Sequence, residues 1–148
     1  MKNTFIPSDK LLKPKIKEKW YIIDAKDKCL GRISTQVSNL LRGKNKNIFT
    51  PWQTIGDYII IINANQVKVT GNKSTQKLYF RHSRFPGGEK YESFHALQSR
   101  FPERIFEKAV KGMLPKNRLG RKLFRRLKIY CGASHPHLAQ KPELLHLE

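Results

Sequence analysis

The sequence predicts an α/β layered domain, and two patterns favour this class. The run "DYIIIINA" (57–64) is continuously hydrophobic and rich in β-branched residues, which is typical of a strand buried on both faces of a parallel sheet. An earlier stretch follows the spacing of one helical face, with Leu30, Ile33, Val37, Leu40 and Leu41. A strand, a helix, a second strand and then further helices indicate helices packed on a sheet.

The first half of the chain begins with an expected extended arm over residues 1–19, which contains two prolines and many lysines. "WYIID" (20–24) is a short apolar run and predicts a strand. The helix that starts near residue 30 is expected to end at Gly43, because glycine is the usual residue after a helix C-terminus. "GKNKNIFTPWQTIG" (43–56) is polar and punctuated by Gly and Pro, and it predicts a loop.

The middle of the chain mixes turn signals with short periodic segments. "VKVTGNKSTQKLYF" (67–80) alternates around Thr-Gly-Asn and predicts a hairpin or a strand pair. "RHSRFPGGEK" (81–90) predicts a loop with a Pro-Gly-Gly bend. Ser93 is a candidate N-cap for a short helix that runs through Arg100.

Two further helices are expected before the C-terminal tail. Pro102 suits the first turn of a helix whose apolar stripe is followed by Pro115. A basic helix comes next, with leucines four residues apart at positions 119, 123 and 127, and "KIYC" (128–131) predicts a returning strand. The expected organisation is therefore an arm (1–19), one domain (20–132) and a Pro-containing tail (133–148).

The charge balance bounds the function. The chain has 148 residues with 30 Lys and Arg against 11 Asp and Glu, for a formal charge of +19. This excess is far beyond what solubility requires, and it destabilises a compact chain unless a polyanion neutralises it. Nucleic acid is the first candidate partner and an anionic membrane surface the second. No apolar run reaches the length of a membrane span, and the N-terminus lacks a secretory signal, so we expect the protein to act where it is made.

The strongest local signal is the basic segment after Pro115. Residues 116–128 contain seven Lys or Arg and no acid. Arg118, Arg121 and Arg125 lie at i, i+3 and i+7, so one helical face can present cations while the leucines pack inward. Phosphate binding is the favoured interpretation. The alternative is a solvated face partly paired with the acids of the preceding helix, Glu103 and Glu107.

Other chemistry-bearing patterns are weaker. His135 and His137 lack further ligands for a metal site, and RNA contact is the better interpretation. Cys29 and Cys131 match no metal spacing and are expected to be free, buried thiols. "GGEK" and "TGNK" are not phosphate-binding loops of nucleotide enzymes. An acidic catalytic cluster could use Asp24, Asp27 and Asp57, but helix capping or local ion pairing is the favoured role for Asp24 and Asp57. His82 and Ser83 are adjacent, but the third member of a catalytic triad is lacking.

Aromatic residues are scattered through the basic loops. Phe85 and Trp52 could stack on exposed bases, although core packing is an equal alternative for Trp52. Of Tyr79 and Phe80, the one that faces inward is expected to pack in the core.

Several long motifs, in order, resemble the L-thirteen family of bacterial-type large-subunit ribosomal proteins. They are "WYIIDAKDKCLGR", "LLRGKNKNIFTP", "GDYIIIINANQVKVTGNK", "YFRHSRFPGG", "PERIFEKAVKGMLPKN", the overlapping "AVKGMLPKNRLGRKLFRRLKIYCG" and "HPHLAQ". The similarity covers residues 20 to the C-terminus. The chain departs from the usual family pattern at Trp52, Thr54, Arg84 and Cys131. The arm is more similar to those of plastid-type members.

The resemblance implies a three-layer α/β/α fold with a mostly parallel four-stranded sheet. It also implies a structural, non-catalytic protein that binds large-subunit rRNA, contacts neighbouring ribosomal proteins, supports early subunit assembly and, in some members, represses its own message. The ribosome of a bacterial cytoplasm or plastid stroma is the implied location, with no cofactor, metal, membrane or small-molecule substrate. The alternatives are a basic nucleic-acid-processing enzyme and a non-ribosomal RNA-binding protein.

The candidate rRNA-binding residues are the cations of the predicted basic surfaces, with one tryptophan and three histidines. They are Arg32, Arg42, Lys44, Lys46, Trp52, Lys73, Arg81, His82, Arg84, Lys111, Lys116, Arg118, Arg121, Lys122, Arg125, Arg126, Lys128, His135 and His137.

Overall fold

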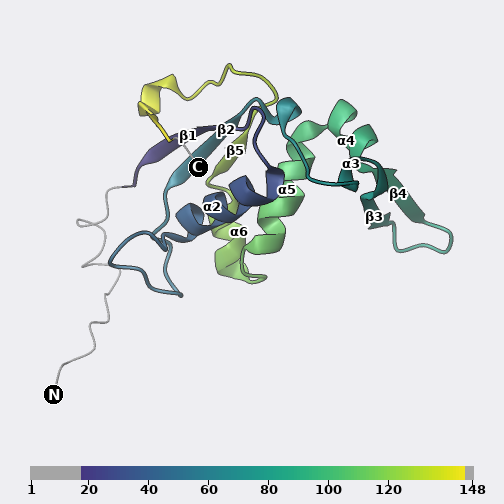
Figure 1. The fold of residues 1–148 in the computed structure, drawn as a ribbon. Helices are drawn as coiled ribbons and strands as arrows, with labels where there is room; N and C mark the ends of the chain where they lie inside the picture. Colours follow the sequence, from purple (N-terminus) through teal and green to yellow (C-terminus); the bar gives the residue numbers. More distant parts are fainter. Residues whose placement is uncertain (1–17, 146–148) are drawn as a thin grey trace.

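A parallel four-stranded sheet organises the computed structural model, which describes residues 18–145 (Figure 1). The strand order is β5-β2-β1-β6, and every neighbouring pair is parallel. The strands are β1 (Trp20–Asp24), β2 (Tyr58–Ile62), β5 (Leu127–Ile129) and β6 (Glu143–Leu144). Residues 1–17 of the expected arm lie outside the described residues.

The central strand β2 is buried on both faces, as its continuous isoleucine run predicts. Ile59, Ile60 and Ile61 are all fully buried. Ile59 and Ile61 belong to the main hydrophobic core, whereas Ile60 points to the opposite face of the sheet because successive strand residues alternate. The strand is shorter than the predicted run 57–64, since Asn63 adopts a left-handed conformation (φ 55°) and begins the 3₁₀ turn η1 (Ala64–Gln66).

Four helices lie on one side of the sheet. They are α2 (Leu30–Arg42), α4 (Phe94–Arg100), α5 (Pro102–Met113) and α6 (Arg118–Phe124). Helices α2 and α5 contact the strands, and α4 and α6 pack against α5. The predicted stops and caps of these helices are confirmed: Gly43 follows α2 with φ 75°, Ser93 accepts a hydrogen bond from the Ala96 N–H, and Pro102 opens α5. The core cluster draws on all four helices, with Val37, Leu97, Phe106 and Leu123 among its members.

The C-terminal segment covers the opposite face of the sheet and carries the 3₁₀ turn η2 (Leu138–Gln140). Trp20 stacks on Tyr58 with ring centroids 4.3 Å apart, and His137 lies 5.3 Å from Trp20. The tail then returns to the sheet as β6, an edge strand that the sequence pattern did not predict. The fold class, an α/β layered domain with a parallel four-stranded sheet, is confirmed.

A two-stranded hairpin projects from the helical layer, away from the main sheet (Figure 1). Strand β3 (Leu78–His82) pairs antiparallel with β4 (Glu89–Ser93). The prediction of a hairpin within residues 67–80 is wrong, because Gly71 (φ 62°) instead leads into the short helix α3 (Lys73–Gln76). The hairpin turn is the segment interpreted as a loop, where Arg84 and Gly87 both adopt positive φ.

The basic helix is also shorter than predicted. Its leucine spacing extends to Leu127, but α6 ends at Phe124 and Leu127 opens β5 opposite Ile59. The Ile59 N–H donates to the Arg126 carbonyl at 3.1 Å, so pairing with β2 overrides the helical pattern at this point. Within residues 18–145, no helix is long and apolar enough to cross a membrane.

Candidate nucleic-acid interface

Six exposed cations gather around the junction of α5 and α6, and we call them the α6 patch. They are Lys111, Lys116, Arg118, Arg121, Lys122 and Arg125. Lys111 lies in the last turn of α5, Lys116 in the connection, and the other four on α6 or at its C-terminal boundary. Every member was predicted from the sequence, and the structure brings them onto one corner of the helical layer.

Two local features hold α6 against the end of α5. The Asn117 side-chain oxygen caps α6 by accepting a hydrogen bond from the Gly120 N–H at 2.8 Å. Gly120 itself lies against the connection, where an added Cβ would meet the Pro115 carbonyl oxygen at 1.8 Å. Only a residue without a side chain allows this close approach, so the glycine sets the position of the cations that follow it.

Acidic partners for this patch are lacking among the described residues. Within residues 18–145, none of the six cations forms a salt bridge. Glu103, one of the two acids considered as partners, instead accepts a contact from the Cys131 thiol at 3.4 Å. Partial desolvation of the thiol and this neighbouring carboxylate raise the pKa of Cys131. The expectation that Cys131 is buried is wrong, because its residue is exposed, although both cysteines are free as predicted.

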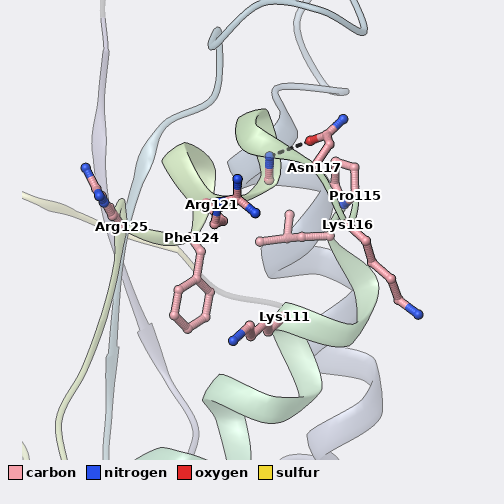
Figure 2. Close-up of a pocket in the computed structure, with 9 residues that line it drawn as sticks. Lys111, Pro115, Lys116, Asn117, Arg121, Phe124 and Arg125 are labelled. Carbon is pink, nitrogen blue, oxygen red and sulfur yellow. Dashed lines mark hydrogen bonds between the residues drawn. The ribbon is translucent and has the colours of Figure 1, made fainter.

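A hollow of about 490 Å³ opens within the α6 patch (Figure 2). Its apolar lining comes from Leu114, Pro115 and Phe124, and no acid lines it. Its cationic lining comes from Lys111, Lys116, Arg121 and Arg125. Figure 2 shows the Phe124 ring below Arg121, with the Lys111 side chain extending toward the ring.

The loop before β2 adds further cations near the N-terminal ends of the strands, close to the point where α6 leads into β5. Because the strands are parallel, the segments that precede β2 and β5 meet at one edge. The Arg126 guanidinium confirms this proximity by donating to the Gly56 carbonyl. The exposed residues Lys44 and Trp52 lie in this loop, and half-buried Arg42 ends α2 beside it. Trp52 is 61% exposed, so the core-packing alternative for this residue is wrong.

Two predicted binding residues at this edge have structural partners. Lys46 Nζ lies 2.5 Å from the buried Asp57 Oδ1 and 3.0 Å from the Ile55 carbonyl oxygen. Arg126 pairs with Glu18 at 2.6 Å and lies over the Tyr58 ring, 4.9 Å from its centroid. Arg126 was predicted as an rRNA-binding cation of the basic segment, but its partners lie inward because the residue follows α6 and leads into β5.

The remaining predicted residues lie elsewhere. Arg32 is exposed in the first turn of α2, at the opposite end of that helix from Arg42. Exposed cations and an imidazole mark the hairpin and the short helix before it: Lys73, Arg81, His82 and Arg84. Lys128, His135 and His137 belong to the face covered by the tail.

The histidines of the tail are engaged within the protein. His137 Nε2 lies 2.7 Å from the Tyr130 hydroxyl, and the His135 ring lies 6.4 Å from the His137 ring. Burial is the largest cause that lowers the pKa of His137, followed by the positive charge of Lys128. The neutral imidazole is therefore favoured at this position. No group of three potential metal ligands occurs within residues 18–145.

Asp57 is separated from Asp24, so the three aspartates weighed as an acidic cluster do not meet. Asp24 ends β1 and Asp57 precedes the parallel strand β2, so these two residues lie at opposite ends of the strands, about 17 Å apart at the rise of a strand. Hydrogen bonds from the Asn63 amide and the Lys26 N–H lower the pKa of Asp24. Asp57 pairs with Lys46, which confirms the expected local ion pairing.

Sequence reasoning missed the apolar lining of the hollow. In the sequence, Phe124 follows the inward-facing Leu123 and carries no separate signal. In the structure, α6 ends at Phe124, and its ring lies half-buried at the surface. Tyr79 is the inward member of its pair: it packs against the core, whereas Phe80 is 55% exposed on the hairpin. Lys77 and Lys108 lie over the Tyr79 ring, 5.5 and 4.6 Å from its centroid, and burial raises its pKa.

Comparison with known sequences places this arrangement in a family. The sequence profile described as Ribosomal protein L13 matches residues 18–136, which include strands β1, β2 and β5 of the sheet and the α6 patch. The chain belongs to the ribosomal protein L13 family. The resemblance noted from the sequence motifs is thereby confirmed.

Individual relatives of this family are similar over most of their length. The large ribosomal subunit protein uL13 of Cyanothece sp. is 57% identical over 148 residues, covering 100% of this chain and 97% of the relative. The uL13 of Acaryochloris marina is 61% identical over 131 residues, 88% of this chain and 87% of the relative. The uL13c of Porphyra purpurea is 63% identical over 126 residues, 85% of this chain and 89% of the relative.

Proposed function

We propose that the protein is a structural, non-catalytic constituent of the large ribosomal subunit and binds its rRNA chiefly through the α6 patch. Six exposed cations without a carboxylate partner within residues 18–145 carry this proposal. Phosphate groups supply the missing negative charge, and Arg and Lys bind them by charge-assisted hydrogen bonds. Membership of the ribosomal protein L13 family supports RNA as the polyanion in preference to a membrane surface.

The loop before β2 extends this interface along the sheet edge. Lys44 and Arg42 add phosphate contacts there, and the exposed Trp52 ring offers a stacking surface for an unpaired base. The hairpin forms a second contact through Arg81, His82 and Arg84. Neighbouring large-subunit proteins are further partners, and the cyanobacterial and plastid relatives support a ribosome in a bacterial cytoplasm or a plastid stroma.

Salt dependence tests the α6 patch directly. Each cation bound to a phosphate releases condensed counterions, so the slope of log affinity against log salt falls by roughly 0.7–0.9 for each such cation that is neutralised. Replacing Arg118, Arg121 and Arg125 by Gln should therefore lower the slope for a large-subunit rRNA fragment by roughly 2–3.

A matched control removes the same charge elsewhere. Changing Lys26, Lys108 and Lys141 to Gln also removes three exposed cations that form no salt bridge within residues 18–145 and that lie outside the predicted interface. This control variant should keep most of the slope of log affinity against log salt that the native protein shows. Equal slopes in the two triple variants would show that diffuse charge, not the α6 patch, drives binding, and failure of the native protein to bind rRNA would contradict the function itself.

A further inference from the structure

The hollow in the α6 patch combines two surfaces that a double helix does not use together. Phosphates of a duplex need only the cations on its rim, whereas Leu114, Pro115 and Phe124 form an apolar part that a duplex backbone would leave in contact with water. A ligand that uses both surfaces carries a negative charge and a flat apolar ring. We propose that the hollow binds a single unpaired nucleotide of the RNA, with its base extruded from the helical stack.

The size and composition of the hollow fit one such unit. About 490 Å³ lies within the range of roughly 300–1,000 Å³ that is typical of sites for small molecules. Arg121 and Lys111 lie beside the Phe124 ring in Figure 2, so a base stacked on that ring would keep its phosphate close to both cations. The absence of an acidic residue from the lining removes any repulsion of the phosphate.

This inference rests on the proposed RNA-binding function, and the experiment separates the two. The affinity of the full chain is measured for two RNA hairpins with the same stem sequence, of which one is fully paired and the other carries a single bulged 2-aminopurine. The native protein should bind the bulged hairpin at least about 5-fold more tightly, since stacking of one base on an aromatic side chain is worth roughly 5- to 150-fold in affinity. The fluorescence of the bulged base should change on binding.

Variants at Phe124 identify the stacking surface. Phe124→Leu keeps an apolar side chain against the core but removes the ring, so it should abolish the preference for the bulge without changing the salt slope. Phe124→Tyr keeps the ring and should retain the preference, and Phe80→Leu, on the distant hairpin, should leave it intact. Melting curves establish that each variant is folded.

Each other outcome overturns the inference. Equal affinity of the native protein for both hairpins, with a normal salt slope, would leave the RNA-binding function standing and remove the nucleotide pocket, as would a full preference in folded Phe124→Leu. Failure to bind either hairpin would contradict the proposed function as well. Displacement of the bulged hairpin by an acidic, Phe-containing peptide at concentrations below the RNA dissociation constant would assign the hollow to a protein partner instead.

Discussion

Replacing Lys46 by Met tests whether this cation belongs to the fold or to the RNA interface. Its Nζ lies 2.5 Å from Asp57 Oδ1, and the Asp57 side chain is fully buried whereas that of Lys46 is 22% exposed. Without the ammonium group, Oδ1 keeps only the hydrogen bond from the Lys19 backbone N–H at 3.0 Å, and Oδ2 has no partner within the described residues. The variant therefore leaves a buried carboxylate that is largely uncompensated.

The expected loss of stability is large. Removing one partner of a buried ion pair costs about 3–5 kcal/mol, and the remaining Lys19 N–H bond favours the lower end, about 3 kcal/mol. Domains of this kind have a free energy of unfolding of about 5–15 kcal/mol, so the loss is a substantial fraction of the total. With a denaturant slope of about 2 kcal/mol per molar urea, the unfolding midpoint should fall by about 1.5 M at pH 7.

The neighbouring exposed lysine supplies the control. Lys44→Met removes the same chemical group two residues away and should change stability by no more than about 0.5 kcal/mol. Adding Asp57→Asn to Lys46→Met removes the buried charge and should restore part of the loss. A decrease below about 1 kcal/mol in Lys46→Met, together with a weaker salt dependence of RNA binding, would refute the reasoning and make Lys46 an RNA contact.

Two further predictions concern packing and protonation. Gly120→Ala should destabilise the domain by about 1–3 kcal/mol or more, because the new methyl group collides with the Pro115 carbonyl. Gly112→Ala should instead stabilise α5 by about 0.5–1 kcal/mol, because a Cβ at this position meets no atom within 4 Å. Urea titrations measure both changes. Burial lowers the pKa of His137, so the stability that depends on its neutral ring is present above about pH 6.5 and is lost as the pH falls through the lowered pKa. Melting temperatures between pH 7.5 and 5 should therefore fall less in His137→Gln than in the native protein, and an equal fall would exclude His137, with its Tyr130 contact, as the cause.

Strands and helices with strong local patterns were predictable from the sequence. The isoleucine run of β2 can be satisfied only by burial on both faces, and the stripe of α2 ends at a glycine whose left-handed conformation excludes most other residues. The position of each of these elements follows from residues that lie within the element or next to it in the sequence. The number of strands came from the resemblance, since β6 has only two residues and no pattern of its own.

Elements defined by tertiary pairing were harder to predict. Leu127 continues the leucine spacing of α6, yet its backbone is needed opposite Ile59 in the sheet. Likewise Gly71 and Gly87 both offer a turn with positive φ, and local sequence does not determine which turn joins two strands. The hairpin forms around Gly87, where β3 and β4 pair over five residues each, whereas the segment after Gly71 becomes helical.

The same distinction applies to the candidate interface, where net charge alone overstates the surface available to phosphates. Arg126 and Lys46 are cations in the middle of basic segments, but the sheet edge uses them to satisfy the Gly56 carbonyl and the Asp57 carboxylate. A cation that must stay beside a buried carboxylate cannot leave it for a phosphate without the cost of an unpaired buried charge. Arg121 has no such obligation within residues 18–145, and it lies next to an aromatic ring. We therefore propose that selectivity for RNA depends less on the total charge of the chain than on the exposed cations that lack a carboxylate partner within residues 18–145 and lie beside apolar surface.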